Sequence, residues 1–124
     1  MTVEQIEEMN KKFQDRALSL SELIPQREVL EFSSLLKRKS GAIHTSFQKM
    51  IHAQEETRFW ECLESTEEIM DDLVYELDRL HDLNCLMKIK TLEDFIKFGY
   101  DLLSVYSMAS DQLVKHKANI HKVI

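Results

Sequence analysis

The sequence predicts an all-α protein, an antiparallel up-down-up-down four-helix bundle that forms one domain over residues 1–124. Two glycines and one proline in the whole chain leave little material for tight turns, which favours long helices joined by few connections. A chain of this length supports one hydrophobic core. Apolar residues recur at steps of three and four along four segments, which is the spacing of an amphipathic helix.

The first helix is expected over about residues 2–23. Pro25 ends it, because proline lacks the N–H donor that a helix interior needs, and the same proline suits the first position of the next helix. The apolar stripe of the first helix consists of Ile6, Met9, Phe13, Ala17, Leu20 and Ile24.

The second helix follows Pro25 and also carries six apolar residues on one face. These residues are Val29, Phe32, Leu36, Ile43, Phe47 and Met50. Gly41 lies inside this helix, where glycine costs about 1 kcal/mol relative to alanine. We interpret Gly41 as a point where a neighbouring helix approaches closely.

The third helix has the most regular pattern, a heptad seam held for three repeats. The seam consists of Phe59, Leu63, Thr66, Met70, Leu73, Leu77 and Leu80. A turn near Gln54, with Thr57 as the N-cap, is expected to separate it from the second helix, because a single domain must fold back to bury its stripes. The alternative is one continuous rod, since residues 51–58 contain neither glycine nor proline. Asn84 is expected to end the third helix as a left-handed cap.

The fourth helix is expected to begin with Thr91 as its cap and Glu93 in its first turn, where the helix dipole favours an acid. Its apolar stripe consists of Leu92, Phe95, Gly99, Leu102, Tyr106, Ala109 and Leu113. Three lysines suit its negative C-terminal end, namely Lys115, Lys117 and Lys122.

Charge is unevenly distributed along the chain. Residues 55–82 contain eleven acidic residues and two arginines, a local charge of −9 in a chain of net charge −6, so the remainder carries +3. Such a separation indicates contacts oriented by charge, between subunits or with a partner, and disfavours wrapping of this segment around nucleic acid. The candidate acidic interface on the face opposite the seam consists of Glu61, Glu64, Glu68 and Asp71.

Lys37, Arg38 and Lys39 form the one compact basic cluster, and Lys115 is a further candidate for a basic interface. The cluster could grip phosphates, dock against an acidic helix or simply be solvated, because adjacent residues of a helix point in different directions. Trp60 lies about 100° around the helix from the seam. Its ring either covers a second edge of the core or contacts another subunit, where tryptophan is enriched.

Catalytic and metal-binding patterns are sparse. A di-metal site in a bundle needs two Glu-x-x-His pairs and two further glutamates, and the nearest candidate is a single Asp78-x-x-His81 pair beside the seam. Its simplest interpretation is a solvated acid and a half-exposed histidine. Two glycines cannot build a phosphate-binding loop or a nucleophile elbow. We therefore expect no enzymatic activity, no metal and no cofactor.

Cellular location is predicted from three features. Cys62 and Cys85 make no disulfide or metal framework, and Cys62 is expected to act as a small hydrophobic residue. The opening residues have neither the basic start nor the apolar run of a signal peptide. No stretch approaches the roughly 20 apolar residues that a membrane span needs. A cytoplasmic protein with reduced thiols and no membrane association is expected.

The order of residues through the second and third helices resembles a known family. The resemblance is carried by Ile24-Pro25, the run Phe32-Ser33-Ser34-Leu35-Leu36-Lys37-Arg38, and the apolar positions Ile43, Phe47, Phe59, Leu63, Leu73, Leu77 and Leu83. In these positions the chain is similar to the four-helix bundle proteins encoded in intervening sequences of bacterial large-subunit ribosomal RNA genes, which look like relatives of the accessory variability proteins of diversity-generating retroelements. It departs from them at four positions, because Ala42, Ser46, Lys49 and Met50 stand where Ser, Asn, Glu and Gly are usual.

The resemblance implies a bacterial homo-oligomer, by analogy a five-fold barrel of bundles. Our leading hypothesis is a non-enzymatic oligomeric binding or scaffold protein that acts through protein–protein contacts. In it the acids of the third helix face Lys37, Arg38 or Lys115 of a neighbouring subunit. The second hypothesis is an accessory nucleic-acid-binding factor, associated with a ribosomal RNA intervening sequence or a reverse transcriptase. The basic character of the relatives that assist reverse transcriptases contrasts with the acidic third helix here.

Overall fold

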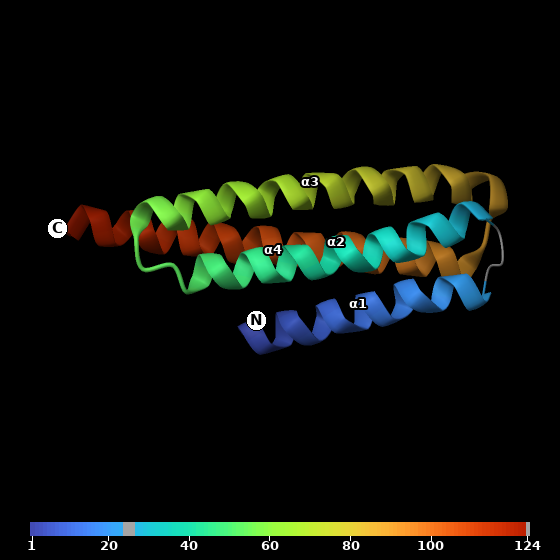
Figure 1. The fold of residues 1–124 in the computed structure, drawn as a ribbon, viewed down its shortest axis with the longest axis horizontal. Coiled ribbons are helices and arrows are strands. Elements are labelled where there is room, and N and C mark those ends of the chain that lie inside the picture. Colours follow the sequence, from blue (N-terminus) through green and yellow to red (C-terminus); the bar gives the residue numbers. More distant parts are fainter. Residues whose placement is uncertain (24–26, 124) are drawn as a thin grey trace.

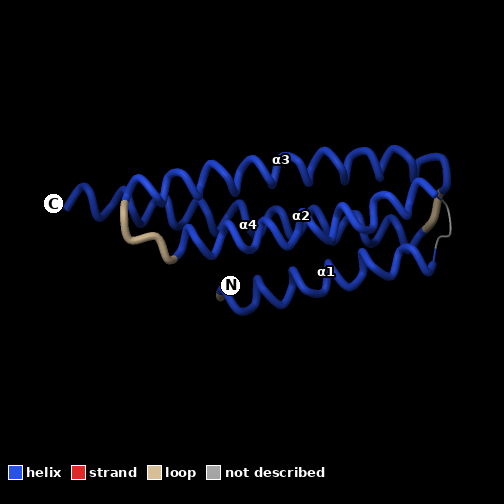
Figure 2. Tube along the Cα trace, viewed as in Figure 1, coloured by secondary structure: helices blue, strands red, loops and turns tan. Residues whose placement is uncertain are grey.

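The computed structural model describes residues 1–23 and 27–123, with side chains outside 21–23, 28–29 and 118–123. All regular secondary structure in these ranges is helical (Figures 1 and 2). The helices are α1 Val3–Leu23, α2 Arg27–Ile51, α3 Glu56–Met87 and α4 Lys90–Val123. The predicted all-α class with four helices is therefore confirmed. Four sequence-based expectations lie outside the described residues, namely those for Ile24, Pro25 and the side chains of Val29 and Lys122.

The four helices pack along their lengths. α1 packs against α2 and α4, α3 packs against the same two helices, and α1 and α3 lie on opposite sides of the molecule (Figure 1). The α2–α3 connection lies at the end of the molecule that holds both termini, where α4 extends past the other helices, and the α3–α4 connection lies at the other end. Within the described residues, none of the helices combines the length and apolar character required to cross a membrane.

The predicted apolar stripes form the core. Most of the stripe residues whose side chains are described are buried, and Met9, Met70, Ala109 and Leu113 are half-buried against them. Full burial of a large apolar side chain stabilises the fold by about 1.5–3 kcal/mol. Each helix contributes such residues, so the core is continuous between all four. The residues that are least exposed include Phe13, Leu36, Leu73, Leu77 and Tyr106.

The α2–α3 boundary was the least certain in the sequence, and the two helices are separate. α2 ends at Ile51 and α3 begins at Glu56, so the expected turn near Gln54 is confirmed and the continuous rod is wrong. The predicted cap is also wrong, because the N-cap of α3 is Glu55, which makes no side-chain capping bond, and Thr57 lies inside the helix.

The α3–α4 turn depends on Asn84 in a way that differs from the prediction. The left-handed residue is Lys88 (φ 54°), whose N–H donates to the Asn84 carbonyl, while Asn84 itself lies inside α3. The Asn84 side chain instead holds the turn, since Oδ1 accepts from the Ile89 N–H at 2.9 Å and Nδ2 donates to the Ile89 carbonyl at 3.2 Å. Thr91 is not the cap of α4, because that helix already includes Lys90.

Gly99, rather than Gly41, marks the close approach of helices. A Cβ added at Gly99 would lie 2.9 Å from both terminal carbons of Leu77 on α3 and 3.0 Å from the ring of Phe13 on α1. A Cβ at Gly41 would meet only the Gln14 amide, at an ordinary 3.7 Å. The interpretation of Gly41 as a point of close approach is therefore wrong. At Gly99 the neighbouring helices pack so closely that a side chain would displace Leu77 or Phe13.

Candidate protein-interaction surface

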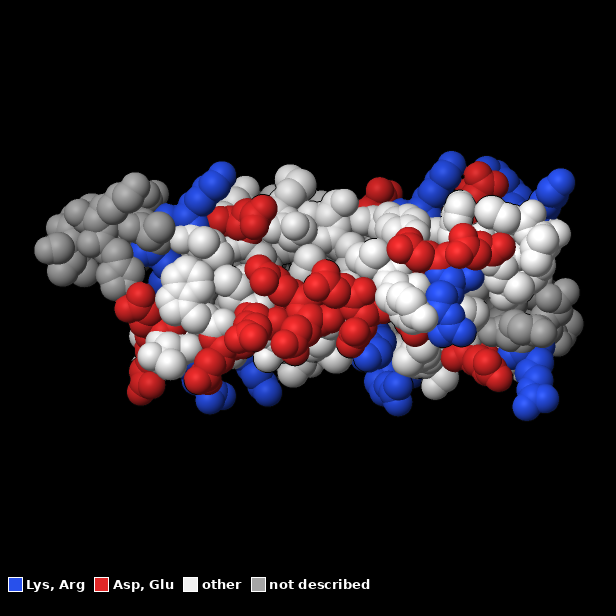
Figure 3. Space-filling model, turned by 90° about the horizontal axis from the view of Figure 1, so that it is seen from above, with Lys and Arg blue, Asp and Glu red and all other residues white. Residues whose placement is uncertain are grey.

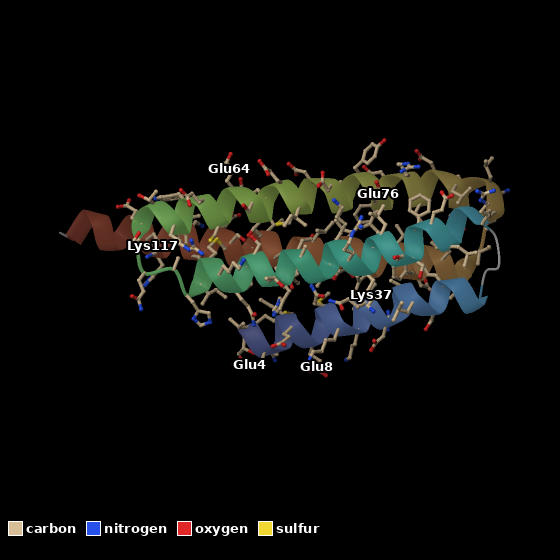
Figure 4. All side chains as sticks on the ribbon, viewed as in Figure 1. Glu4, Glu8, Lys37, Glu64, Glu76 and Lys117 are labelled. Carbon is tan, nitrogen blue, oxygen red and sulfur yellow. The ribbon has the colours of Figure 1, made fainter. Side chains whose placement is uncertain are left out.

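The predicted acidic residues form one face of α3. Glu61, Glu64, Glu68 and Asp71 follow one another at steps of three and four, and all four are exposed. We call these four residues the α3 acidic face. Acidic side chains gather over the middle of α3 when the molecule is viewed from above (Figure 3). Glu64 points away from the bundle (Figure 4). The α3 acidic face is therefore presented to solvent along a straight helical edge.

The carboxylates of the α3 acidic face have no ion pair within the part of the chain that the structure describes. Nearby acids on the same helix do have partners: Asp72 binds Lys39 of α2 at 3.1 Å, and Glu76 binds Arg79 at 3.2 Å. Glu64 and Glu68 are like charges four residues apart, an arrangement that costs about 0.2–0.5 kcal/mol in a helix. These charges therefore do not stabilise the fold of a single chain, but they would attract a cationic partner.

Trp60 lies beside one end of the α3 acidic face, near the start of α3. Its ring packs edge-on against the buried Phe59, with ring centroids 5.1 Å apart, and its Nε1 lies 3.4 Å from a carboxylate oxygen of Glu56. The residue is 40% exposed. One edge of the ring thus reaches the rim of the core, and the rest is available to solvent. The ammonium of Lys117, on α4, lies 5.2 Å from the centroid of the Phe59 ring.

The four basic candidates do not form a single patch. Lys37 and Arg38 are exposed on α2 and have no ion pair among the described residues, whereas Lys39 is half-buried and binds Asp72. Lys37 lies on the side of α2 that faces α1 (Figure 4). Lys115 is exposed on α4, two residues before Lys117, and so lies near the start of α3 at the other end of the bundle. A basic interface would therefore use Lys37 and Arg38, or Lys115, but not all of them together.

Sequence reasoning missed a buried polar network that joins α1, α2 and α4. The Asn10 amide donates to the Tyr106 hydroxyl at 2.7 Å and to the Ser40 carbonyl at 3.0 Å, and its oxygen accepts from the Ser40 hydroxyl and from Gln14. The Tyr106 hydroxyl lies 2.8 Å from Nδ1 of His44. The sequence did contain an indication of this network, because Asn10 and Ser40 each occupy a position of an apolar stripe, with apolar residues three and four positions away.

Two groups of this network have a shifted pKa. Burial raises the pKa of Tyr106, against the opposing effect of the hydrogen bond from Asn10. Burial also lowers the pKa of His44 from its ordinary value of 6.5. Because Tyr106 already accepts from Asn10, its own proton can be donated to Nδ1 of His44, which accepts a hydrogen bond when the ring is neutral with its proton on Nε2. Nε2 of His44 is buried and has no hydrogen-bond partner in the part of the chain that the structure describes.

Among the described residues, no His, Cys, Asp or Glu of another helix completes a metal site with the Asp78-x-x-His81 pair. The carboxylate of Asp78 accepts from the hydroxyl of Tyr100, and burial together with this bond raises the pKa of Tyr100 to about 12. The side chain of His81 is 58% exposed and lies 3.8 Å from Asp82. Among the described residues, no three His, Cys, Asp or Glu side chains converge as metal ligands.

The chain was compared with protein-family models, with curated proteins and with solved structures. None of the three comparisons gives a match.

Proposed function

We propose that this chain is a non-enzymatic cytoplasmic scaffold or binding protein that acts through protein–protein contacts, and that the α3 acidic face is its interaction surface. The observation that carries the proposal is the set of four exposed carboxylates without an ion pair among the described residues. Exposed Trp60 beside them offers an aromatic anchor of the kind enriched at interfaces. A cationic surface that covers this face would remove the repulsion between like charges.

We further propose an antiparallel up-down-up-down bundle. Contacts between α1 and α2 support this orientation, because Ser33 donates to the carbonyl of Ala17 whereas Ser40 contacts Asn10, so residue numbers rise along one helix as they fall along the other. The positions of the α2–α3 and α3–α4 connections at opposite ends of the molecule support it as well.

The proposed partner surface is a second copy of the same chain. α2 presents Lys37 and Arg38 as exposed cations without an ion pair in the described part, and α4 presents Lys115. Contact between the basic side of one copy and the α3 acidic face of the next joins two different surfaces. Such contacts form a ring where the rotation between copies closes, and an open filament where it does not. The resemblance to the ribosomal intervening-sequence proteins suggests five subunits.

Light scattering coupled to size exclusion, at low and high salt, tests this proposal. The expected result at low salt is a mass several times 14.7 kDa that falls as salt is raised, because exposed ion pairs are screened. Glu64→Gln/Glu68→Gln should shift the assembly toward the monomer. Glu4→Gln/Glu8→Gln is the matched control, since it removes the same charge from α1, on the opposite side of the molecule (Figure 4). A monomer at both salt concentrations contradicts the proposal.

The second candidate function is accessory nucleic-acid binding, favoured by Lys37 and Arg38, which are exposed and form no ion pair with another described residue. Contacts of this kind with phosphates weaken steeply as salt rises. RNA or DNA binding measured by fluorescence anisotropy at low salt should then be reduced by Lys37→Gln/Arg38→Gln. Absence of any binding by the wild type at low salt eliminates this candidate.

A further inference from the structure

A thiol and an imidazole lie together on the exposed side of α3, near its C-terminal end. Sγ of the free cysteine Cys85 is 4.0 Å from Nδ1 of His81, and both residues line a hollow of about 360 Å³ beside the α3–α4 connection. Their spacing of four residues places them one turn apart on the same side of the helix. The α3–α4 connection is at the end of the bundle away from both termini (Figure 1), so the extension of α4 does not cover the pair.

The separation of these two atoms suits a shared zinc ion. Zinc binds a thiolate sulfur at about 2.3 Å and an imidazole nitrogen at about 2.0–2.1 Å. The two bonds laid end to end span about 4.3 Å, slightly more than the observed separation. One ion can therefore bind Sγ of Cys85 and Nδ1 of His81 together after a small rotation of the side chains, without any movement of the helix.

One chain supplies only half of such a site. Structural zinc takes four nitrogen or sulfur ligands in a tetrahedron. Among the described residues, no three His, Cys, Asp or Glu side chains converge on a possible metal. Glu93 lines the same hollow, but its carboxylate binds Lys97 at 3.6 Å. The two remaining ligands would therefore come from outside the chain.

A second copy of the chain has the ligands that are missing. Contact about a two-fold axis brings the same surface of both copies together, so the thiol and imidazole of one chain would meet those of the other. Two cysteines and two histidines are one of the ligand sets that structural zinc uses. Leu86, next to Cys85, is 85% exposed, and the same contact would cover this apolar side chain.

The charges around the hollow favour two copies over one. Lys88 and Lys90 line the hollow together with Cys85 and His81. A zinc ion bound to one thiolate and one neutral imidazole keeps a positive charge, which the two ammonium groups would repel. Two thiolates and two neutral imidazoles make the zinc complex neutral, so the lysines no longer oppose it.

We propose that Cys85 and His81 form half of a zinc site, and that two copies of the chain join at the α3–α4 end around one zinc ion held by two cysteines and two histidines. The expectation of no metal considered the ligands of a single chain, and this site needs two. The contact is independent of the proposed scaffold function, because it joins identical surfaces and uses none of the residues of the α3 acidic face.

Light scattering coupled to size exclusion tests the proposal, with a reductant that keeps the thiols free and at high salt, where contacts between exposed charges are screened. Half an equivalent of zinc per chain should raise the mass from 14.7 kDa to twice that value, and EDTA should reverse the change. Cobalt(II) in place of zinc should give a thiolate-to-metal charge-transfer band and the strong visible absorption of a tetrahedral ion, complete at one metal per two chains. Failure of the scaffold proposal would leave this result readable, because that proposal predicts a monomer at high salt.

Cys85→Ala/His81→Gln should abolish both the increase in mass and the cobalt spectrum. Cys62→Ala/His116→Gln is the matched control, because it also removes one thiol and one imidazole but neither residue lines the hollow. It should form the dimer with zinc as the wild type does. A wild-type chain that stays monomeric with zinc, one metal bound per chain, or equal loss of the dimer in the control would each overturn the proposal.

Discussion

The polar groups between α1, α2 and α4 and those on the outward face of α3 are used in opposite ways. In the first region Asn10 is almost fully buried and makes four hydrogen bonds, so every donor and acceptor of its amide has a partner. In the second region the carboxylates of the α3 acidic face are exposed and have no ion pair among the described residues. The first arrangement holds this chain together, and the second contributes nothing to a single chain.

This difference separates stability from recognition within one small domain. A buried amide with four partners is satisfied at one axial position of α1 relative to α2 and α4, so it opposes sliding of the apolar stripes past one another. An exposed acid four residues from another acid has no such role, because water already solvates it. Removal of charge or polarity should therefore have opposite effects on the free energy of unfolding in the two regions.

The largest effect is expected for Asn10→Ala. The substitution leaves the Ser40 hydroxyl without its partner in the core and removes the bonds that Asn10 donates to the Ser40 carbonyl and to the Tyr106 hydroxyl, which keeps only His44. A buried polar group left unsatisfied costs about 1–3 kcal/mol. We expect a loss of about 3 kcal/mol in the free energy of unfolding, measured by urea denaturation. Asn10→Asp, which keeps the acceptor, should be less destabilising near pH 4 than near pH 8. A loss below about 1 kcal/mol for Asn10→Ala would remove the contrast between the two regions.

The apolar part of the bundle was predictable because burial follows helical spacing. The seam through Leu73 and Leu77 follows from steps of three and four alone. The polar network was not predictable to the same degree. Asn10 and Ser40 interrupt the stripes visibly, but their partner Tyr106 is 96 residues from Asn10, and spacing within one helix does not indicate which helices become neighbours.

The helix ends show a second limit. Thr57, Asn84 and Thr91 have the side chains that caps favour, yet each lies inside a helix. Cap identity depends on the backbone conformation within one or two residues of the boundary, which spacing does not resolve. The charges of the α3 acidic face were predictable as a solvent-facing set. The separation of Lys115 from Lys37 and Arg38 was not, because it depends on how far α4 extends along the bundle.

A smaller effect, tied to pH, is expected from His44. Burial lowers its pKa below the ordinary value of 6.5, while Glu7 of α1 opposes this shift and Lys11 adds to it. The folded state therefore binds fewer protons than the unfolded chain just below pH 6.5. The contribution of His44 to stability is complete above that pH and falls as pH decreases toward the pKa in the folded state.

Thermal unfolding between pH 8 and pH 5 measures this contribution. In the wild type the melting temperature should decrease as pH falls below about 6.5. His44→Gln should make that decrease shallower, because glutamine has no proton to gain. His116→Gln, at an exposed position of α4, is the control and should leave the slope as it is in the wild type. An equal slope in all three proteins would show that protonation elsewhere determines the acid response.

The smallest effect on stability, and the one of opposite sign, is expected on the α3 acidic face. Glu64→Gln/Glu68→Gln removes a repulsive pair of charges four residues apart, which should raise the free energy of unfolding of the monomer by about 0.2–0.5 kcal/mol. Urea denaturation at a protein concentration where the chain is monomeric measures this change, and high salt should abolish it because screening already weakens the repulsion. Destabilisation by the same variant would mean that these carboxylates support the fold of a single chain. The α3 acidic face would then resemble the Asn10 network in its role, and its exposure would no longer indicate a partner.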